Sequence, residues 1–246
     1  SNYIKLFQKH KQMVPWFPSI LIGDDYKTAV DLLKGLQPKR IVTNNTGIAY
    51  EAHKEKIPWI AGPHLNLVNS SSLLCLKEKL TCSGAFISNE LNKYQLKCVQ
   101  RPDDFKLFYS IYHPILLMTS RQCLFHQVTG CEKNGMDEEC IETCNRSATL
   151  TNLKKVNFII EKSRGAYNSI YSNTNLLNTD IVTDLPDIFS GFFIDLRDIK
   201  TETKAEMDKS KIIKLFENHL SGSHDSKQQL HQVIHPTINT QYKQGL

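Results

Sequence analysis

Short apolar runs alternate with amphipathic stretches over the first 110 residues. The apolar runs predict five strands, at Ser19–Ile22, Arg40–Thr43, Pro58–Gly62, Gly84–Ser88 and Phe105–Ile111. Helical spacing of apolar positions predicts four intervening helices, at Tyr26–Leu36, Thr46–Glu55, Ser70–Lys79 and Glu90–Cys98. Such alternation is typical of βαβ units around a parallel sheet, whose strands are apolar throughout because both faces are buried. An open doubly wound sheet and a (β/α) barrel both fit this pattern.

The pattern changes after residue 120. Strands are predicted at Val156–Glu161 and Phe192–Ile199, and helices at Ile181–Phe189 and Ser210–Leu220. From Ser221 onward the chain is polar and without clear periodicity, which predicts a flexible tail. The expected organisation is therefore a lead-in at residues 1–18, a barrel-like region at 19–220 with a cysteine-rich segment at 120–146, and a tail at 221–246.

Composition narrows the class of protein only slightly. The chain has 246 residues, and its longest apolar run, Ile111–Met118, is interrupted by His113 and Pro114. That run is too short to span a bilayer, and the polar start Ser1–Lys11 does not resemble a secretory signal. We therefore expect a cytoplasmic protein without membrane contact. A net charge of +5 is compatible with an RNA partner without requiring one.

Cysteine spacing gives the strongest chemical signal. Seven cysteines occur, and Cys123, Cys131, Cys140 and Cys144 fall within 22 residues. Dense thiols in a cytosolic chain more often bind metal than form disulfides. Four thiolates can hold an iron–sulfur cluster or a structural zinc ion, although only Cys140 and Cys144 have the short spacing of a typical zinc pair. Reduced thiols without a ligand are the remaining alternative.

Other polar residues follow the predicted strands. His113 lies at the end of an apolar strand, where barrel enzymes place functional side chains. Asn66, Ser88 and Glu90 occupy similar positions, and Asn69 and Asn89 are interpreted as helix N-caps.

Two arginines flank the four clustered cysteines, and two histidines elsewhere are further candidates. Arg121 and Arg146 can stabilise an anionic cluster or substrate, or can form surface ion pairs with Glu138, Glu139 or Glu142. His64 and His126 are further candidate metal ligands. The metal-hydrolase motif H-E-x-x-H and the serine-hydrolase motif G-x-S-x-G are both absent from the sequence.

The order of several short motifs resembles the U32 peptidase family, also called collagenase-like. These motifs begin with Gly62–Asn69, Ser88-Asn89-Glu90-Leu91 and Tyr112-His113-Pro114. They continue with Ser120-Arg121-Gln122-Cys123, the run from Cys140 to Arg146, and the segments Leu185–Phe189 and Phe193–Arg197. The resemblance covers residues 19–220. It suggests either a shortened barrel or the C-terminal part of a longer protein of this family, similar to those that take part in 23S ribosomal RNA hydroxylation.

The resemblance implies a TIM-like barrel, and in several relatives a [4Fe-4S] cluster. Such relatives take part in hydroxylation of 23S ribosomal RNA, of a tRNA wobble uridine or of ubiquinone precursors, and some members are assigned protease activity. It implies cluster ligands at Cys123, Cys131, Cys140 and Cys144, and catalytic roles for His113, Glu90 and Arg121. Many relatives carry a further cysteine where this chain has Leu116, so either Cys131 takes its place or the fourth ligand lies in a missing segment.

Three functions follow as hypotheses. The first is an iron–sulfur protein that acts in RNA hydroxylation, with RNA and a missing N-terminal part or partner subunit as partners. The second is a collagenase-like peptidase acting on unfolded chains. The third is a non-catalytic module whose zinc or thiols are structural.

Overall fold

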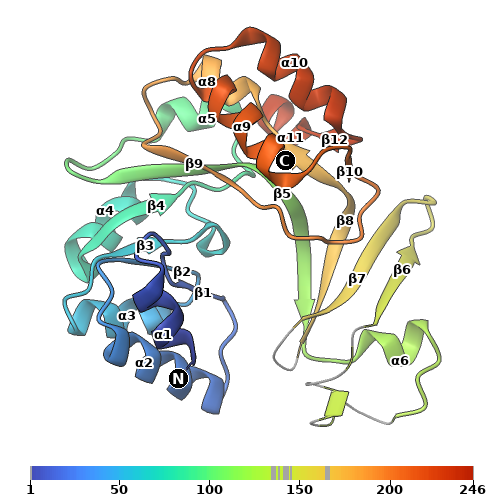
Figure 1. Cartoon of the computed structure of the whole chain (residues 1–246), viewed down its shortest axis with the longest axis horizontal. Coiled ribbons are helices and arrows are strands. Elements are labelled where there is room, and N and C mark those ends of the chain that lie inside the picture. The colour runs from blue at the N-terminus through green and yellow to red at the C-terminus, as the bar shows by residue number, and fades with distance from the viewer. Residues whose placement is uncertain are drawn as a thin grey trace. The chain divides into compact units, whose positions relative to one another are not determined.

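The chain folds into two compact units of mixed α/β structure. The computed structural model describes residues 2–133, 137, 139–140, 144, 146–163 and 167–245 (Figure 1). The first unit comprises Ser1–Ser110, Asp184–Phe193 and Thr240–Leu246, and the second comprises Ile111–Thr183 and Ile194–Asn239. Strand β5 (Lys106–Ser120) passes from the first unit to the second after Ser110. The two units thus divide the region that the sequence predicts as one barrel-like domain.

A parallel sheet forms the centre of the first unit. Its strands follow chain order: β1 (Trp16–Phe17), β2 (Ile41–Thr43), β3 (Trp59–Ala61), β4 (Cys82–Phe86) and the start of β5. Strand β9 (Gly191–Ile194) pairs with β5. The helices of this unit are α1 (Asn2–Lys9), α2 (Asp24–Leu36), α3 (Thr46–Lys54), α4 (Ser70–Leu80), α5 (Lys93–Cys98) and α11 (Thr240–Gln244), with a 3-10 turn at Pro63–Leu65. The predicted parallel βαβ arrangement is confirmed here.

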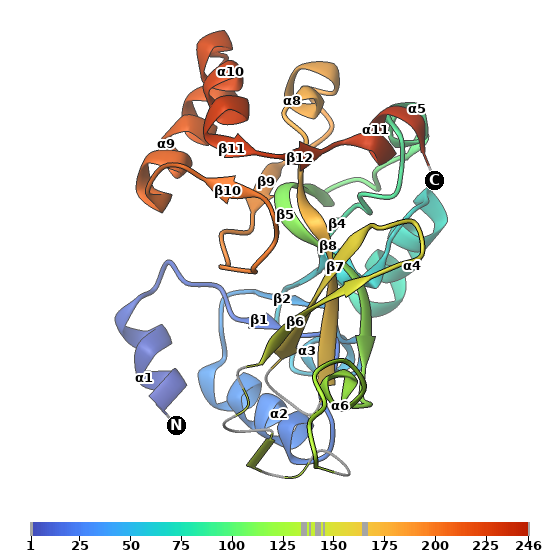
Figure 2. The same ribbon diagram turned by 90° about the vertical axis from the view of Figure 1, so that its right-hand side faces the viewer.

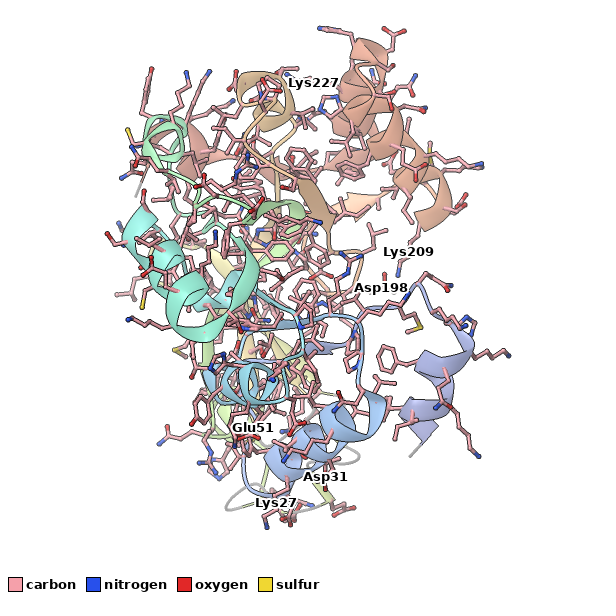
Figure 3. All side chains as sticks on the ribbon, turned by 90° about the vertical axis from the view of Figure 1, so that its left-hand side faces the viewer. Lys27, Asp31, Glu51, Asp198, Lys209 and Lys227 are labelled. Atoms are coloured by element: carbon pink, nitrogen blue, oxygen red, sulfur yellow. The ribbon has the colours of Figure 1, made fainter. Side chains whose placement is uncertain are left out.

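Burial explains why these segments form strands and helices. All three residues of β2 and of β3 are buried, as expected for a parallel strand covered on both faces. Helices α2 and α3 pack their apolar stripes inward, including the fully buried Leu33 and Ile48. On their outer surface, Glu51 of α3 bonds Lys54 at 2.9 Å and approaches Lys34 of α2 at 3.8 Å. Figure 3 shows Glu51 beside α2.

The second unit is built on an antiparallel sheet. The remainder of β5 pairs with β8 (Tyr167–Leu177), which pairs with β7 (Asn157–Ser163), and β7 pairs with β6 (Ser147–Thr151). Strand β12 (Thr237–Ile238) joins β8 in parallel, and β10 (Lys204–Ala205) pairs with β11 (Ile234–His235). Helices of this unit include α6 (Leu124–Val128), α8 (Asp180–Asp184, whose last residue belongs to the first unit), α9 (Lys209–Leu220) and α10 (His224–Val233).

The final residues differ from the prediction of a tail without structure. Residues 224–244 form α10, β11, β12 and α11, and they bury Leu230, Ile234 and Tyr242. Helices α9 and α10 lie side by side next to β10 and β11 (Figure 2). Two histidine contacts hold these helices to Thr179, which follows β8. His219 is buried and its Nε2 lies 3.0 Å from the carbonyl of Thr179, and the Thr179 hydroxyl lies 2.8 Å from Nε2 of His231 in a partly buried contact. An ion pair of 2.8 Å between Lys209 and Asp198 lies at the start of α9 (Figure 3).

Several element boundaries also differ from those predicted. The first strand is Trp16–Phe17 rather than Ser19–Ile22, because Trp16 and Phe17 pair with Val42 and Thr43. Strand β5 extends to Ser120, and helix α5 begins only at Lys93, where Asn92 caps it. Asn69 caps α4 as predicted, whereas Asn89 donates to the carbonyl of Ser110 at 2.8 Å and caps no helix.

In the part of the chain that the structure describes, none of the helices has the length and apolar character needed to cross a membrane.

Close packing between β4 and β5 makes Gly84 a sensitive position. A Cβ atom there would lie 2.7 Å from the backbone oxygen of Lys106, which cannot move without breaking the strand pairing. We therefore expect Gly84→Ala to lower the free energy of unfolding by about 1–3 kcal/mol in urea titrations, the usual cost of overpacking. Gly35→Ala in α2 is the matched control, since its Cβ would meet only the end of Ile4 and alanine favours a helix. Equal stability of the Gly84 variant and the wild type would contradict this account of the sheet.

Candidate functional site

Polar side chains gather where the parallel strands of the first unit end. Asn45 follows β2 and donates through Nδ2 to the carbonyl of Ser19 at 3.0 Å. Ser19 Oγ lies 3.4 Å from Nδ1 of His64, which follows β3. Asn66 Nδ2 donates to Glu90 Oε2 at 3.3 Å, so the predicted residue Glu90 takes part in this edge. The carboxyl ends of parallel strands thus present one hydroxyl, one imidazole, amides and a carboxylate, as such sheets commonly do at binding sites.

The glycine after β3 is needed to form this edge. The buried side chain of Asn44 accepts a hydrogen bond from the backbone N–H of His64 at 2.9 Å. A Cβ atom on Gly62 would lie 2.2 Å from Asn44 Oδ1, a separation that no real contact allows. Only glycine therefore leaves room for the amide that orients the segment carrying His64.

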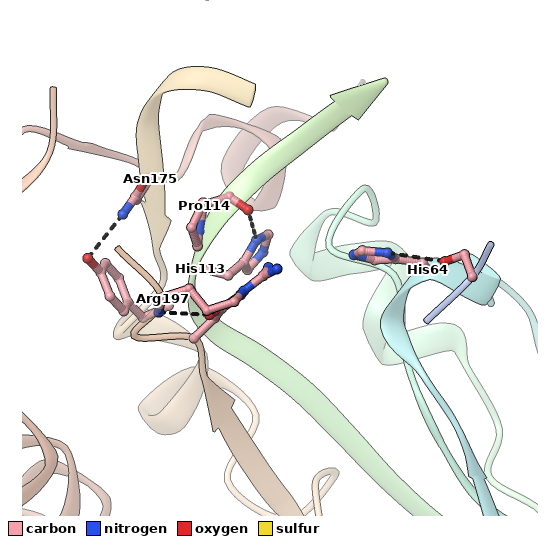
Figure 4. A network of polar contacts seen from close by, with 8 residues as sticks. His64, His113, Pro114, Asn175 and Arg197 are labelled. Carbon is pink, nitrogen blue, oxygen red and sulfur yellow. Dashed lines mark hydrogen bonds and ion pairs between the residues drawn. The ribbon is translucent and has the colours of Figure 1, made fainter. Parts of the chain in front are cut away.

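The second unit contains a histidine with an unused nitrogen. His113 lies on β5, and its Nδ1 is 2.9 Å from the carbonyl oxygen of Pro114 (Figure 4). Because a carbonyl oxygen only accepts, Nδ1 carries the proton and Nε2 keeps its lone pair. Among the described residues no group bonds Nε2, although this atom is fully buried. Burial also lowers the pKa of His113, so the ring is neutral at pH 7.

An arginine–aspartate pair acts on His113. Asp195 and Arg197 follow β9, and the guanidinium Nε lies 3.0 and 2.9 Å from the two carboxylate oxygens, with Nη2 at 2.6 Å from Oδ2. Asp195 raises the pKa of Arg197, and both residues exert a charge effect on the pKa of His113. Figure 4 shows the Arg197 and His113 side chains approaching each other. The Asp195 carboxylate is buried whereas Arg197 is more than half exposed, so the pair presents a fixed guanidinium beside a neutral imidazole.

A buried amide supports the strand that carries His113. Asn175 of β8 donates to the Tyr112 hydroxyl at 3.0 Å and accepts from the Thr201 hydroxyl at 3.0 Å. Its backbone N–H donates to the Thr203 hydroxyl at 2.8 Å. Burial raises the pKa of Tyr112, which stays protonated at neutral pH. These bonds fix the backbone next to His113, and rigid support of this kind favours a defined ligand geometry.

The three predicted catalytic residues do not form one group within a single unit. Glu90 belongs to the first unit, and His113 and Arg121 belong to the second. Arg121 is exposed just after β5, and no hydrogen-bond or ion-pair partner for it is found within the described ranges. The guanidinium that acts on His113 is that of Arg197, which reasoning from the residues did not single out. The sequence signal that could have found it is the pair of charges, Asp195 and Arg197, that follows the apolar run Phe192–Ile194.

A comparison with models of protein families shows which family the chain is related to. The sequence model of peptidase family U32 matches residues 23–245. The chain belongs to peptidase family U32. No curated protein matches it, and neither does any solved structure. The resemblance inferred from the motifs is thereby confirmed at the level of the family.

The cysteine segment of this U32 protein follows β5. Cys123 lies at the N-cap of α6, and Cys131, Cys140 and Cys144 follow. All four are partly buried free thiols, whereas burial in β4 raises the pKa of the Cys82 thiol to about 12. Asp137 accepts a hydrogen bond from the backbone of Cys140 at 2.8 Å and pairs with Lys133.

The described residues do not by themselves form a metal centre. No three histidine, cysteine, aspartate or glutamate side chains among them are placed to hold a metal ion. Much of the motif from Cys140 to Arg146 lies outside the described residues, namely 141–143 and 145, and so do Glu138 and Glu142, two predicted ion-pair partners of the flanking arginines. Arg146 instead lies with Nη1 3.4 Å from the Thr129 hydroxyl, and His126 is exposed on α6.

The buried neutral state of His113 predicts a pH dependence of stability. Its pKa is lowered in the folded state, so the unfolded chain binds more protons below about pH 6.5, and stability falls as the pH drops through that value. We expect wild type to lose up to about 1.4 kcal/mol per pH unit more than His113→Gln between pH 6.5 and 5. Urea unfolding at several pH values measures this difference. His224→Gln, at an exposed histidine, is the control, and it should retain the wild-type slope. Identical slopes for wild type and His113→Gln would contradict the assignment.

Proposed function

We propose that this U32 protein takes part in the hydroxylation of RNA, on a (β/α) barrel-type scaffold, with a [4Fe-4S] cluster held by Cys123, Cys131, Cys140 and Cys144. The observation that carries the proposal is the set of four free, partly buried thiols within one short segment after β5. A thiol in this state can become a ligand, whereas Cys82 is buried in a strand and resists ionisation.

The chemistry of the donors favours a cluster over a single zinc ion. Iron–sulfur clusters take four thiolates at varied spacings, whereas structural zinc sites usually take two closely spaced pairs, and this chain has one such pair. When bound, a cluster would supply electron transfer.

The role of His113 follows from its hydrogen bonding. Its Nε2 lone pair is unused among the described residues but buried, so a movement that uncovers this atom would let it accept a hydrogen bond from a substrate hydroxyl or N–H group. Arg197, held by Asp195, supplies a positive charge near that point, which suits an anionic substrate such as RNA. Glu90 and Arg121 stay predicted site residues, with Glu90 oriented by Asn66.

Peptide-bond cleavage is the alternative function, and the name of the family suggests it. It requires an activated nucleophile or a metal-bound water. Ser19 Oγ and His64 Nδ1 are 3.4 Å apart, longer than the roughly 2.6–3.2 Å of a typical nucleophile–base pair. A zinc-binding module without catalysis is the third possibility, and it shares the thiol ligands of the cluster.

Nucleoside mass spectrometry tests the proposed function. We expect RNA from cells that make the wild-type chain to contain a nucleoside one oxygen atom heavier than its parent, and this product to disappear with Cys140→Ser. Cys98→Ser is the matched control, because Cys98 is an exposed free thiol of α5 outside the segment, and the product should persist. If no RNA nucleoside depends on the chain, the proposal fails. Gelatin cleavage that survives Cys140→Ser but is lost with His113→Ala would establish the peptidase alternative instead.

A further inference from the structure

Strand β1 carries an exposed tryptophan ring, and the segment before it in the chain carries exposed positive charges. Residues 1–23 contain Lys5, Lys9 and Lys11 but no aspartate or glutamate. The three lysines are exposed, and no ion-pair partner for them is found in the described part of the chain. Trp16 follows five residues after Lys11 and is 38% exposed. This segment precedes residue 23, where the match to the family begins.

Trp16 is held in place by other aromatic side chains of the first unit. Its ring lies 4.8 Å from that of Phe193 and 5.6 Å from that of Phe86, measured between ring centroids. Phe86 in turn stacks with Phe108 at 5.4 Å. A ring supported in this way loses little conformational freedom when a ligand stacks on it, because packing has already fixed its orientation.

The polar strand ends adjoin this segment along the chain. Ser19 comes three residues after Trp16, and it contacts both Asn45 and His64. Hydroxyl, amide and imidazole groups can bond the edge of a planar ring whose face lies on tryptophan.

We propose that Trp16 is a stacking platform for a nucleobase of single-stranded RNA, and that Lys5, Lys9 and Lys11 contact the neighbouring phosphates. The proposal rests on the proposed RNA function and names the part of the chain that binds the substrate. Proteins that bind single strands combine cationic side chains along the backbone with aromatic rings under the bases, as this segment does. The lack of any acidic residue before Asp24 leaves the positive charge uncompensated within the segment.

The chain's own fluorescence provides the measurement. It contains two tryptophans, and Trp59 is fully buried with its Nε1–H bonded to the carbonyl of Leu80 at 2.8 Å. A fluorescence change on titration with a single-stranded oligouridylate therefore reports on Trp16. We expect a saturable change in wild type that disappears in Trp16→Phe, which keeps a ring and should bind with nearly unchanged affinity by filter binding.

Loss of the ring tests the stacking itself. Trp16→Ala should bind the same oligonucleotide about 5- to 150-fold more weakly, the usual effect of removing one stacked base contact. Tyr94→Ala, at a tyrosine 72% exposed on α5, is the control and should bind as wild type does. Circular dichroism melting of each variant establishes that it is folded. Wild-type affinity in folded Trp16→Ala would overturn the proposal and leave the RNA function intact. Failure of wild type to bind the oligonucleotide would overturn both.

The lysines are tested through salt dependence. Replacing Lys5, Lys9 and Lys11 by alanine should reduce the slope of log affinity against log salt by about 2, since each phosphate contact on a single strand contributes about 0.7. The matched control replaces Lys154, Lys155 and Lys214, which are also exposed and belong to the second unit. It changes the net charge by the same amount and should leave the slope near its wild-type value. Equal reductions in both triple variants would show a general charge effect and overturn the assignment of these lysines.

Discussion

Burial of the short parallel strands on both faces decides where polar groups can lie in the first unit. Every residue of strands β2 and β3 is buried, so the polar side chains lie in the segments that follow the carboxyl ends of these strands. Asn44 and Gly62 show how tightly this edge is built, because the amide of one occupies the space that a side chain on the other would need. The same sheet places Trp16 at its edge, and a lysine-rich segment without acidic residues precedes this residue in the chain.

Much of this arrangement could be predicted from the sequence because it depends on local patterns. Apolar runs and amphipathic stretches identified β2, β3, α2, α3 and α4 to within a few residues. Strand β8 was missed because its buried positions include Asn168, Ser169 and Asn175, which pair and hydrogen-bond across the sheet rather than supply an apolar run. Helix α10 was missed because its inward face is narrow, with only Ser226 and Leu230 buried.

The candidate site was predictable in part for the same reason. His113 could be found because it interrupts an apolar strand, yet its free Nε2 depends on the Pro114 carbonyl and on burial. Arg197 acts on His113 across 84 positions of chain, and no local pattern shows that approach. The cysteine spacing gives the ligand type without giving the geometry. Membership of family U32 does not by itself distinguish hydroxylation from peptide cleavage, and an experiment has to separate these two activities.

The measurement that tests the account most directly is the content of iron, acid-labile sulfide and zinc per chain, together with the visible absorption spectrum, in protein purified without oxygen. The account predicts about four irons with matching sulfide and a broad visible absorption, as four thiolates around one cluster require. One zinc ion without iron would contradict it and would make the cysteine segment a structural zinc site. Protein without any metal would contradict it as well, and would leave the thiols of Cys123, Cys131, Cys140 and Cys144 without a ligand.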